Sequence, residues 1–222
     1  MRGVFISLEG PEGAGKTTQQ QRLASRLRAA GYDVFVTREP GGTAIGEQIR
    51  RILLDASHAR MAPQTEMLLF AASRAQFVAE MVRPALEMGK IVLSDRYVHA
   101  SLAYQGYARG LGVDLVRAVN DVATGGLLPD LVILLDVPPD LGLRRALEGR
   151  DAAADRMERE DLEFHERVRE GFLRLAAEDP RIRLITGTDD PDEIAERIWR
   201  EVEQLLKAKG RWRQADPPGG MG

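Results

Sequence analysis

A glycine-rich segment near the amino terminus has the residue types and spacing that bind a chain of phosphates. Residues 10–17 read GPEGAGKT, a full match to the pattern GxxxxGK followed by Ser or Thr. Glycines let such a loop fold around phosphate with its backbone N–H groups pointing inward. Lys16 would place a positive charge between the β- and γ-phosphates, and the Thr17 hydroxyl would be a ligand for Mg²⁺. The segment predicts that the chain binds a nucleoside triphosphate.

The residues on either side of this loop have the patterns of the two elements that a phosphate-binding loop joins. An apolar run at residues 4–8 has the length of a buried strand. A helical pattern follows at residues 16–30, with Leu23 and Leu27 one turn apart and Gly31 placed to end the helix. A helix that starts at the loop adds its N-terminal dipole to the binding of phosphate.

The rest of the chain repeats this alternation of short apolar runs and longer helical patterns. Further strand-length runs rich in Val, Ile and Leu occupy residues 33–37, 91–94, 131–137 and 182–185. Helical patterns occupy residues 64–82, 113–123 and 161–177. Strands that alternate with helices in this way form parallel sheets with helices on both faces. We predict an α/β fold of three layers: a doubly wound, five-stranded parallel sheet flanked by helices.

The composition of the chain excludes several classes of protein. Its 222 residues include 31 Lys and Arg and 34 Asp and Glu, so the net charge is −3, which argues against binding nucleic acid through bulk charge. The absence of cysteine excludes disulfides, thiolate metal sites and cysteine nucleophiles. No apolar run approaches the ~18 residues of a membrane helix. We expect a cytoplasmic protein with no nucleic-acid partner and no membrane partner.

A phosphate-binding loop alone leaves motors, switches, ATPases and small-molecule kinases open. The sequence lacks the Asn-Lys-x-Asp element with which a GTPase reads guanine. The apolar run that ends at Asp136 resembles a Walker B strand, but Val137, Pro138 and Pro139 follow where a hydrolytic ATPase often carries a second acidic residue. These two observations argue against a GTPase and against a hydrolytic ATPase.

Two polar clusters directly follow apolar runs, at the edge where sheets of this class place their ligands. Residues 38–43 read REPGGT, in which a charged pair precedes glycines that open space for a substrate. Residues 94–97 read SDRY; Asp95 can reach the shell of a bound Mg²⁺ through water, and Arg96 can bind phosphate with two hydrogen bonds. Taken singly, the glycines of the first cluster are also compatible with a tight turn, and the second cluster with a surface ion pair, although its place at the end of a strand favours a binding role.

Two pairs of side chains lie four residues apart and therefore share a helix face. Phe70 and Arg74 would offer a ring that stacks on a base and a guanidinium that hydrogen-bonds a carbonyl. Ser101 and Gln105 would offer polar groups to the edge of a base. Either pair alone is unremarkable, and Phe70 by itself is more typical of a core residue.

Together these motifs resemble those of bacterial thymidylate kinases over nearly the whole chain. The matching segments are GPEGAGKTT from Gly10, REPGGT from Arg38, LFAASRAQ from Leu69, SDRY from Ser94, SLAYQG from Ser101 and DRME from Asp155. The resemblance implies the P-loop kinase fold with a short lid. It implies transfer of the γ-phosphoryl group of ATP to thymidine 5′-monophosphate (dTMP), giving the diphosphate, in the synthesis of dTTP for DNA. It also implies a dependence on Mg²⁺ and a homodimer.

The resemblance assigns roles to the residues that match the family pattern. The implied catalytic residues are Glu12, Lys16, Arg96 and Arg150, and ATP would bind to Gly10, Pro11, Glu12, Gly13, Ala14, Gly15, Lys16, Thr17 and Thr18. The residues implied to bind dTMP are Glu39, Arg50, Phe70, Arg74, Arg96, Ser101, Tyr104 and Gln105. Among them, Phe70 would stack on thymine, Arg74 would reach its O4, and Arg50 and Arg96 would hold the phosphate. Mg²⁺ would be held by Thr17, by Asp95 through water, and by Glu158.

The Arg-rich segment at residues 144–160 is implied to be a mobile lid, although most charge runs are solvated surface helices. Arginines near the transferred phosphoryl group stabilise its negative charge. Positions 11–14 of the P-loop hold no cation, so the resemblance implies that the lid supplies it. Arg150 is our first choice and Arg145 the second, while Arg156 can instead serve the DRME cluster. We place the kinase domain at residues 1–210 and a disordered, Pro- and Gly-rich tail at residues 211–222.

Two other hypotheses compete with this one: a kinase for another nucleotide or a deoxynucleoside, and a P-loop switch or adaptor without useful turnover. The two base-edge pairs favour a pyrimidine carbonyl edge over guanine. The complete set of Lys16, Thr17, Asp95 and Arg96 argues against lost activity. A general base is not required, because a phosphate oxygen is already largely deprotonated at neutral pH. We expect the three histidines, His58, His99 and His165, to be surface or packing residues.

Overall fold

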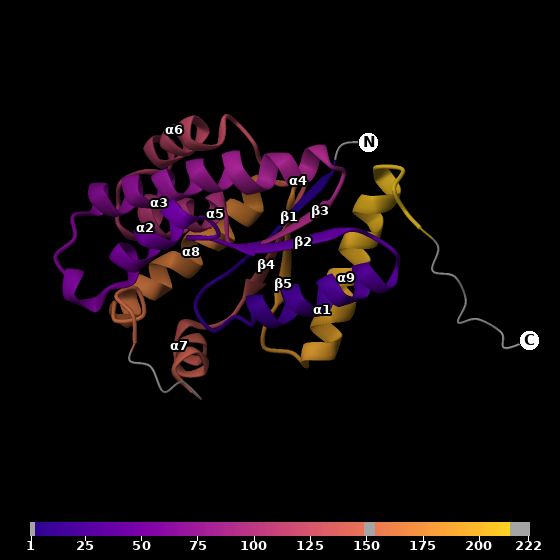
Figure 1. Cartoon of the computed structure of the whole chain (residues 1–222). Coiled ribbons are helices and arrows are strands. Elements are labelled where there is room, and N and C mark those ends of the chain that lie inside the picture. Colours follow the sequence, from indigo (N-terminus) through magenta and orange to yellow (C-terminus); the bar gives the residue numbers. More distant parts are fainter. Residues whose placement is uncertain (1–2, 149–153, 214–222) are drawn as a thin grey trace, which may run out of the picture.

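The computed structural model describes residues 3–148 and 154–213 of the chain (Figure 1). Five strands form one parallel sheet: β1 (Val4–Glu9), β2 (Val34–Arg38), β3 (Ile91–Asp95), β4 (Leu131–Asp136) and β5 (Ile182–Thr186). Their order is β2-β3-β1-β4-β5, and every neighbouring pair is parallel. Strands β2 and β3 thus lie on one side of β1, and β4 and β5 lie on the other, which confirms the predicted doubly wound sheet of five strands.

Helices α1 (Lys16–Ala29) and α9 (Pro191–Ala208) cover one face of the sheet (Figure 1). Alternate residues of β1, Val4, Ile6 and Leu8, point into this layer and pack with Leu23 of α1 and with α9. Helix α9 was not among the helices predicted from the sequence, although its buried positions, Ile194, Ile198, Val202 and Leu206, recur at helical spacing. The helix packs through this stripe, as an amphipathic surface helix does.

The opposite face is covered by a larger set of helices, and Phe5, Val92 and Val132 of the sheet point into this layer. Its members are α3 (Pro63–Phe77), α4 (Arg83–Glu87), α5 (Val98–Ser101), α6 (Val113–Thr124) and α8 (Leu162–Glu178), with π-helical turns at Val78–Val82 and Leu102–Ala108. The predicted helix over 64–82 is thus α3 followed by a π-helical turn.

Two further helices frame the carboxyl edge of the sheet. Helix α2 (Ala44–Leu54) follows the REPGGT segment and starts at Thr43, whose side chain accepts a hydrogen bond from the Gly46 N–H; a short 3₁₀ helix (Ala56–His58) follows α2. Helix α7 (Pro139–Leu147) follows β4 and contains the first four residues of the segment predicted to be a lid. Neither helix was predicted, and residues 149–153 lie outside the described part of the chain.

The residues that follow α9 pack back onto the domain. Trp212 lies with its ring centroid 5.9 Å from that of Trp199, and the Tyr32 hydroxyl donates to the Arg211 carbonyl over 2.9 Å. Order therefore extends through residue 213, and residues 214–222 of the expected tail lie outside the described residues. Of the helices in the described ranges, none combines the length and the apolar character needed to cross a membrane.

Candidate functional site

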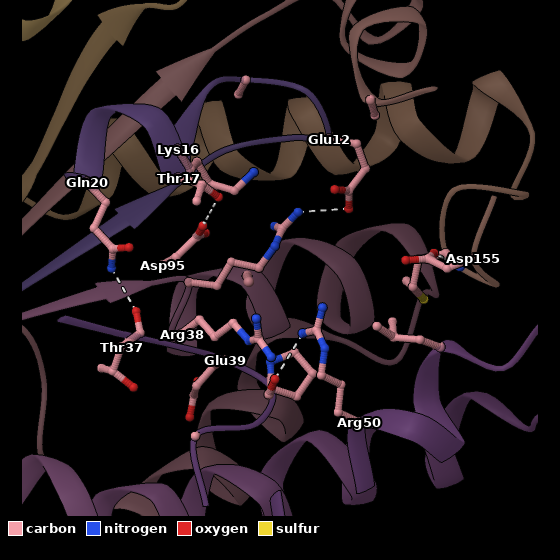
Figure 2. A pocket seen from close by; sticks show the side chains of 18 of the residues that line it. Glu12, Lys16, Thr17, Gln20, Thr37, Arg38, Glu39, Arg50, Asp95 and Asp155 are labelled. Atoms are coloured by element: carbon pink, nitrogen blue, oxygen red, sulfur yellow. Dashed lines mark hydrogen bonds and ion pairs between the residues drawn. The ribbon is translucent and has the colours of Figure 1, made fainter. Parts of the chain in front are cut away.

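A cavity of about 1110 Å³ opens at the carboxyl edge of the sheet, between the P-loop, α2, α3, the end of α5 and the π-helical turn that follows it (Figure 2). It brings together most of the residues singled out in the sequence. The predicted residues that line it are Glu12, Gly13, Ala14, Gly15, Lys16, Thr17, Thr18, Glu39, Arg50, Phe70, Arg74, Asp95, Arg96, Ser101, Tyr104, Gln105, Arg145 and Glu158. Gly10 and Pro11 are not in its lining. The parallel order explains the gathering, because the carboxyl ends of β1, β2 and β3 meet at one edge.

The P-loop is held in shape by backbone that only glycine adopts easily. Gly13 has a φ of 64° and Gly15 a φ of 86°. A Cβ on Gly13 would lie 1.9 Å from the Gly142 carbonyl oxygen of α7, so this glycine also permits close contact between the loop and α7. The loop and α7, the helix that leads into the lid segment, are therefore packed directly on one another.

Lys16 begins α1 and is buried within the loop that precedes it. Its Nζ donates hydrogen bonds to the carbonyl oxygens of Gly10 (3.1 Å) and Pro11 (2.7 Å). Burial, together with the like charge of Arg96, lowers the pKa of Lys16 to about 8. The ammonium is thus fixed beside the loop N–H groups, and an anion in the cavity would favour its charged form.

A threonine and an aspartate from neighbouring elements meet at the floor of the cavity. Thr17 Oγ1 donates to Asp95 Oδ2 over 2.6 Å (Figure 2). Asp95 ends β3 and is paired in register with Leu8 of β1, which places it beside the P-loop. Both groups offer oxygen atoms, the ligands that Mg²⁺ prefers.

Glu12 of the P-loop forms a cluster with Arg96 and Tyr104. Arg96 Nη2 lies 2.8 Å from Glu12 Oε1, and the Tyr104 hydroxyl donates to the same oxygen over 2.9 Å. Burial opposes ionisation of Glu12, but the charges of Arg96 and Lys16 and this hydrogen bond lower its pKa to about 2. The cluster joins the loop to α5 and the π-helical turn and aims the Arg96 guanidinium across the cavity.

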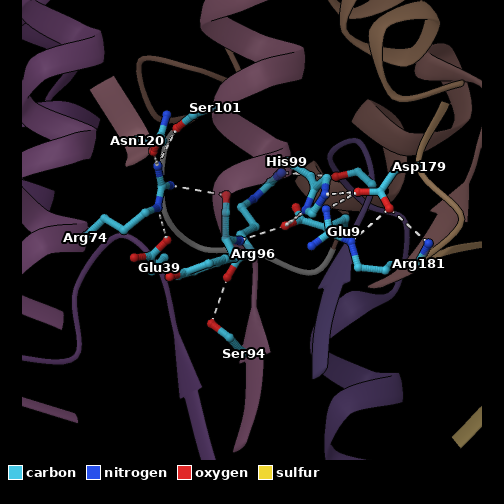
Figure 3. Close-up of polar contacts among 12 residues, drawn as sticks. Glu9, Glu39, Arg74, Ser94, Arg96, His99, Ser101, Asn120, Asp179 and Arg181 are labelled. Atoms are coloured by element: carbon cyan, nitrogen blue, oxygen red, sulfur yellow. Dashed lines mark hydrogen bonds and ion pairs between the residues drawn. The ribbon is translucent and has the colours of Figure 1, made fainter. Parts of the chain in front are cut away.

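Arg96 has a left-handed backbone, with a φ of 71°, the one non-glycine residue with positive φ in the described ranges. Three hydrogen bonds hold this strained conformation: Arg96 N–H to Leu8 O (2.9 Å), Ser94 Oγ to Arg96 O (2.7 Å) and Tyr97 N–H to Glu9 Oε1 (2.8 Å) (Figure 3). A non-glycine residue in this region costs about 1–3 kcal/mol and is found where surrounding structure imposes it. Here the sheet edge imposes the direction of Arg96.

Two arginine side chains lie next to each other on the β2 side of the cavity. Arg38 ends β2 and Arg50 comes from α2; their side chains lie beside one another (Figure 2). Arg50 Nη1 donates to the Pro40 carbonyl over 3.0 Å. Burial and the like charge of Arg38 lower the pKa of Arg50. Arg38 was not among the predicted binding residues, although it begins the REPGGT motif. Two neighbouring cations on a cavity wall favour the binding of an anion.

Arg74 is almost completely buried, and its guanidinium is held on several sides (Figure 3). Its Nε lies 2.7 Å from Glu39 Oε2, its Nη1 donates to Ser101 Oγ (2.9 Å) and to Asn120 Oδ1, and its Nη2 donates to the Tyr97 carbonyl (3.2 Å). Asn120 was missed, because it belongs to no motif and lies 46 residues away on α6.

Phe70 and Gln105 complete this end of the cavity. Phe70 is half-buried on α3 and lines the cavity outside both apolar cores, so the alternative of a core residue does not hold. Gln105 lies on the π-helical turn, and its Nε2 donates to Glu66 Oε1 over 2.8 Å. Glu66 was not predicted either; it lies in the first turn of α3, in a segment whose sequence is that of an ordinary helix.

The candidate lid arginines occupy different environments. Arg145 lines the cavity, and its Nη1 donates to the Gly187 carbonyl over 2.9 Å. Arg156 is buried away from the cavity, where its Nε donates to Leu53 O and its Nη1 lies 2.6 Å from Glu66 Oε2. Arg150 lies outside the described residues. Asp136, at the end of the Walker B-like strand, is paired with Arg169 and not with the P-loop.

The acidic groups around the cavity are spread rather than clustered. Within residues 3–148 and 154–213 no three His, Cys, Asp or Glu side chains form a group that could hold a metal by themselves. Glu158 lines the cavity, and its Oε2 accepts a hydrogen bond from the Asp155 N–H over 3.0 Å. The oxygen donors Thr17, Asp95 and Glu158 suit a hard cation that takes most of its ligands from water and phosphate.

Glu9 stands apart as a fully buried carboxyl group at the end of β1, with Oε2 lacking a hydrogen-bond partner within the described chain. Burial raises its pKa from 4.5 to about 8. Between these values the folded protein keeps a proton that the unfolded chain has lost, so the Glu9 contribution to stability falls as pH rises.

From pH 5 to pH 8, we expect the free energy of unfolding of Glu9→Gln, measured by urea denaturation, to fall less than that of the wild type. Glu170→Gln, an exposed control, should follow the wild type, and parallel curves for Glu9→Gln would contradict the prediction.

Comparison with known proteins was made by family model, by sequence and by structure. The family model described as thymidylate kinase matches residues 8–198. The chain is 50% identical over 211 residues to the thymidylate kinase of Syntrophotalea carbinolica, covering 93% of this chain and 98% of that protein. It is 53% identical over 204 residues to that of Deinococcus radiodurans, covering 91% and 98%. The crystal structure of the thymidylate kinase from Ehrlichia chaffeensis matches with a TM-score of 0.73 and 31% identity, covering 91% of this chain and 99% of that chain.

Proposed function

This chain belongs to the thymidylate kinase family, and we propose that it carries out the family reaction in the cavity at the carboxyl edge of its sheet. The protein is a phosphotransferase that uses ATP to convert dTMP to the diphosphate. The observation that carries the placement is the convergence of cations: Lys16, Arg50 and Arg96 come from three separate elements and line one cavity. Two anionic substrates that meet in one site require such charge.

ATP is proposed to bind at the P-loop, over residues 10–18. The loop N–H groups and the N-terminus of α1 bind the phosphates, and Lys16 neutralises charge that develops on the transferred group. A phosphate near Lys16 would replace the Gly10 and Pro11 carbonyl oxygens as partners of its Nζ. The amino group is therefore already positioned before the nucleotide arrives.

Mg²⁺ is proposed as the cofactor, held by Thr17, by Asp95 through water and by Glu158 from the other side of the cavity. The all-oxygen donor set supports this choice, since hard cations prefer oxygen ligands. The ion supplies neutralisation of phosphate charge when it is bound. The Thr17–Asp95 hydrogen bond keeps both oxygen atoms oriented toward the place of the β- and γ-phosphates.

The acceptor dTMP is proposed to lie across the cavity, with its phosphate at Arg50 and Arg96 and its base between Phe70 and Gln105. Arg74 and Ser101 face the base, and Glu39 and Tyr104 orient the arginines beside it. Glu12 would lie near the sugar. Arg38 is proposed to bind the acceptor phosphate as well, because it lines the cavity and its side chain lies beside that of Arg50 (Figure 2). The aromatic ring and the amide at one end and the guanidiniums at the other match a nucleoside monophosphate.

The chemical step is proposed to need charge and alignment rather than a general base. The acceptor oxygen is already ionised at neutral pH, so binding both substrates in line brings the reacting atoms together. Arg150 is proposed as the lid arginine that neutralises the transferred group, with Arg145 as the second choice. Arg145 is supported by its place in the cavity wall. The three histidines are not given a role; His99 and His165 are buried.

A homodimer is proposed from the apolar surface that remains. Exposed apolar side chains lie on three helices, of which α3 packs against the other two: Ile45 and Ile52 on α2, Leu68 on α3, and Leu115 and Val122 on α6. Val122 is 87% exposed, an unusual position for a valine. Light scattering would give the mass of the assembly in solution.

A cytoplasmic location is proposed because the reaction consumes ATP.

The function is tested by ADP release with dTMP, dUMP, UMP, CMP, AMP and GMP as acceptors. We expect dTMP to be the best acceptor by a wide margin, because the base site offers both donors and acceptors to a carbonyl edge. Release with every acceptor, or with a purine alone, would favour a different nucleotide kinase. Nucleotide binding without release would favour a switch or adaptor.

A further inference from the structure

Behind the wall of the cavity lies a buried carboxylate that touches a side chain on that wall. Glu66 of α3 is fully buried and does not line the cavity. It accepts hydrogen bonds from Gln105 Nε2 (2.8 Å), from Arg109 Nε and Nη2 (3.2 and 3.0 Å) and from Arg156 Nη1 (2.6 Å). Gln105, in contrast, is part of the cavity lining. Glu66 therefore reaches the substrate site only through Gln105.

The charge state of Glu66 determines which end of the Gln105 amide can face it. Burial alone would favour the neutral acid, but hydrogen bonds from Arg109 and Gln105 and the charge of Arg156 keep the pKa of Glu66 below its ordinary value. An ionised carboxylate only accepts hydrogen bonds. The NH₂ group of Gln105 must therefore face Glu66, since a rotated amide would place its oxygen against a carboxylate oxygen.

This orientation leaves a defined pattern toward the cavity. The Gln105 Oε1 accepts no hydrogen bond from any residue that the structure describes, and Nε2 retains a second N–H. The base edge of thymine offers an N3–H donor beside a carbonyl acceptor, which matches one acceptor and one donor. Cytosine presents the reverse, an N3 acceptor beside an amino donor. A glutamine amide that was free to rotate by 180° would bind either edge.

We propose that Glu66 is a specificity-determining positioning residue: it locks the Gln105 amide so that it binds the thymine edge and rejects the cytosine edge. The inference rests on the proposed placement of the dTMP base against Gln105. Arg109 and Arg156 hold the carboxylate, and each keeps another partner, Glu160 and the Leu53 carbonyl, when Glu66 changes. Buried unmatched polar groups are the strongest basis of discrimination between similar ligands.

The test compares two acceptors that differ only at the base edge, dTMP and 5-methyl-2′-deoxycytidine 5′-monophosphate. In Glu66→Gln the new amide can donate or accept, so the Gln105 amide becomes free to rotate. We expect the ratio of kcat/KM for dTMP to that for the cytosine analogue to fall roughly 10- to 100-fold, the value of one hydrogen bond to a charged group. The fall should come mainly from better use of the cytosine analogue.

Two matched variants separate this effect from damage to the fold. Glu160→Gln removes the second partner of Arg109 but leaves the Glu66 carboxylate and its hydrogen bonds from Arg109, Arg156 and Gln105 in place, so the ratio should stay at the wild-type value even if the melting temperature falls. Glu66→Asp keeps an acceptor-only group and should retain the preference. In a Gln105→Ala background, Glu66→Gln should not alter the ratio, because no amide remains to be oriented.

The outcomes distinguish this inference from the proposed function. An unchanged ratio in Glu66→Gln, or an equal loss with both acceptors, would overturn the role of Glu66 while wild-type dTMP kinase activity stands. If Glu66→Gln does not fold, Gln105→Ala decides: the proposal requires the preference for dTMP to fall in this variant, and an unchanged ratio would overturn it. A wild-type protein that does not phosphorylate dTMP would instead overturn the placement of the base.

Discussion

Replacing Lys16 with methionine should lower kcat about 100- to 1000-fold, because it removes the P-loop cation that we propose to face the transferred phosphoryl group. Methionine keeps the length of the apolar stem within the buried loop, and the Gly10 and Pro11 carbonyl oxygens then lose their donor. The ADP-release assay measures kcat, and calorimetric titration with ATP measures the remaining affinity. An activity loss of less than tenfold would show that the lysine is not the principal P-loop charge.

The same variant should not be less stable than the wild type, which separates its effect from misfolding. Burial lowers the pKa of Lys16 to about 8 from 10.5, so at neutral pH the folded protein carries a charge that burial disfavours. Between about pH 8 and 10.5 the unfolded chain binds the proton that the folded one has lost, and wild-type stability gains from this group as pH rises. Lys16→Met should lack that gain. Lys207→Met, on the surface of α9, is the control and should keep both activity and the wild-type pH profile.

Variants that remove the Arg96 guanidinium, such as Arg96→Ala, should have a kcat/KM for dTMP about 100- to 1000-fold below that of the wild type, with an affinity for ATP that is nearly unchanged. This guanidinium is proposed to hold the acceptor phosphate, and it also holds Glu12, whose pKa of about 2 depends on that charge. Arg96→Lys keeps a charge but loses the planar fork, so it should recover only part of the activity. Exposed Arg174, paired with Glu170 one turn away, provides the control substitution to alanine.

The left-handed backbone of Arg96 supplies a second readout. Arg96→Gly and Arg96→Ala both remove the guanidinium and should be equally impaired. Glycine adopts a φ of 71° without strain and alanine does not, so the glycine variant should be more stable than the alanine variant by about 1 kcal/mol. Urea denaturation of the two variants measures the difference. If alanine were the more stable, the backbone of Arg96 would not be under the strain described here.

Much of the fold and of the binding loop was predictable because the signals are local. The P-loop match, with a buried strand before it and a helix after it, specifies its structure within about 30 residues. Apolar runs of strand length alternating with helical patterns predicted the parallel sheet, and parallel strands bring their carboxyl ends to one edge. Hence Asp95 and Arg96, which directly follow β3, were expected at the substrate site and line the cavity. Helices α2, α7 and α9 were missed at the same stage.

The partners of the site residues were not predictable, because they depend on contacts between distant elements. Phe70 and Arg74 share a helix face by spacing alone, but Asn120, which holds Arg74, lies on another helix with no motif around it. In the sequence, Glu66 is likewise an ordinary acidic residue of a helix. Only the π-helical turn of the folded chain places Gln105 against it. The same holds for the lid segment. Its composition identifies the arginines, but their orientation depends on packing, which directs Arg156 toward Glu66 and Arg145 toward the cavity.

The sequence by itself determined the P-loop motif, the class of fold and the edge of the sheet at which the polar clusters gather. These follow from backbone periodicity and from glycine conformations, which act over a few residues. Tertiary structure alone decided how the side chains at that edge are oriented: the left-handed turn that aims Arg96, the placement of Arg38 beside Arg50 (Figure 2), and the carboxylate behind Gln105. Orientation requires a buried partner of fixed charge, and only the packing of helices from distant parts of the chain provides one.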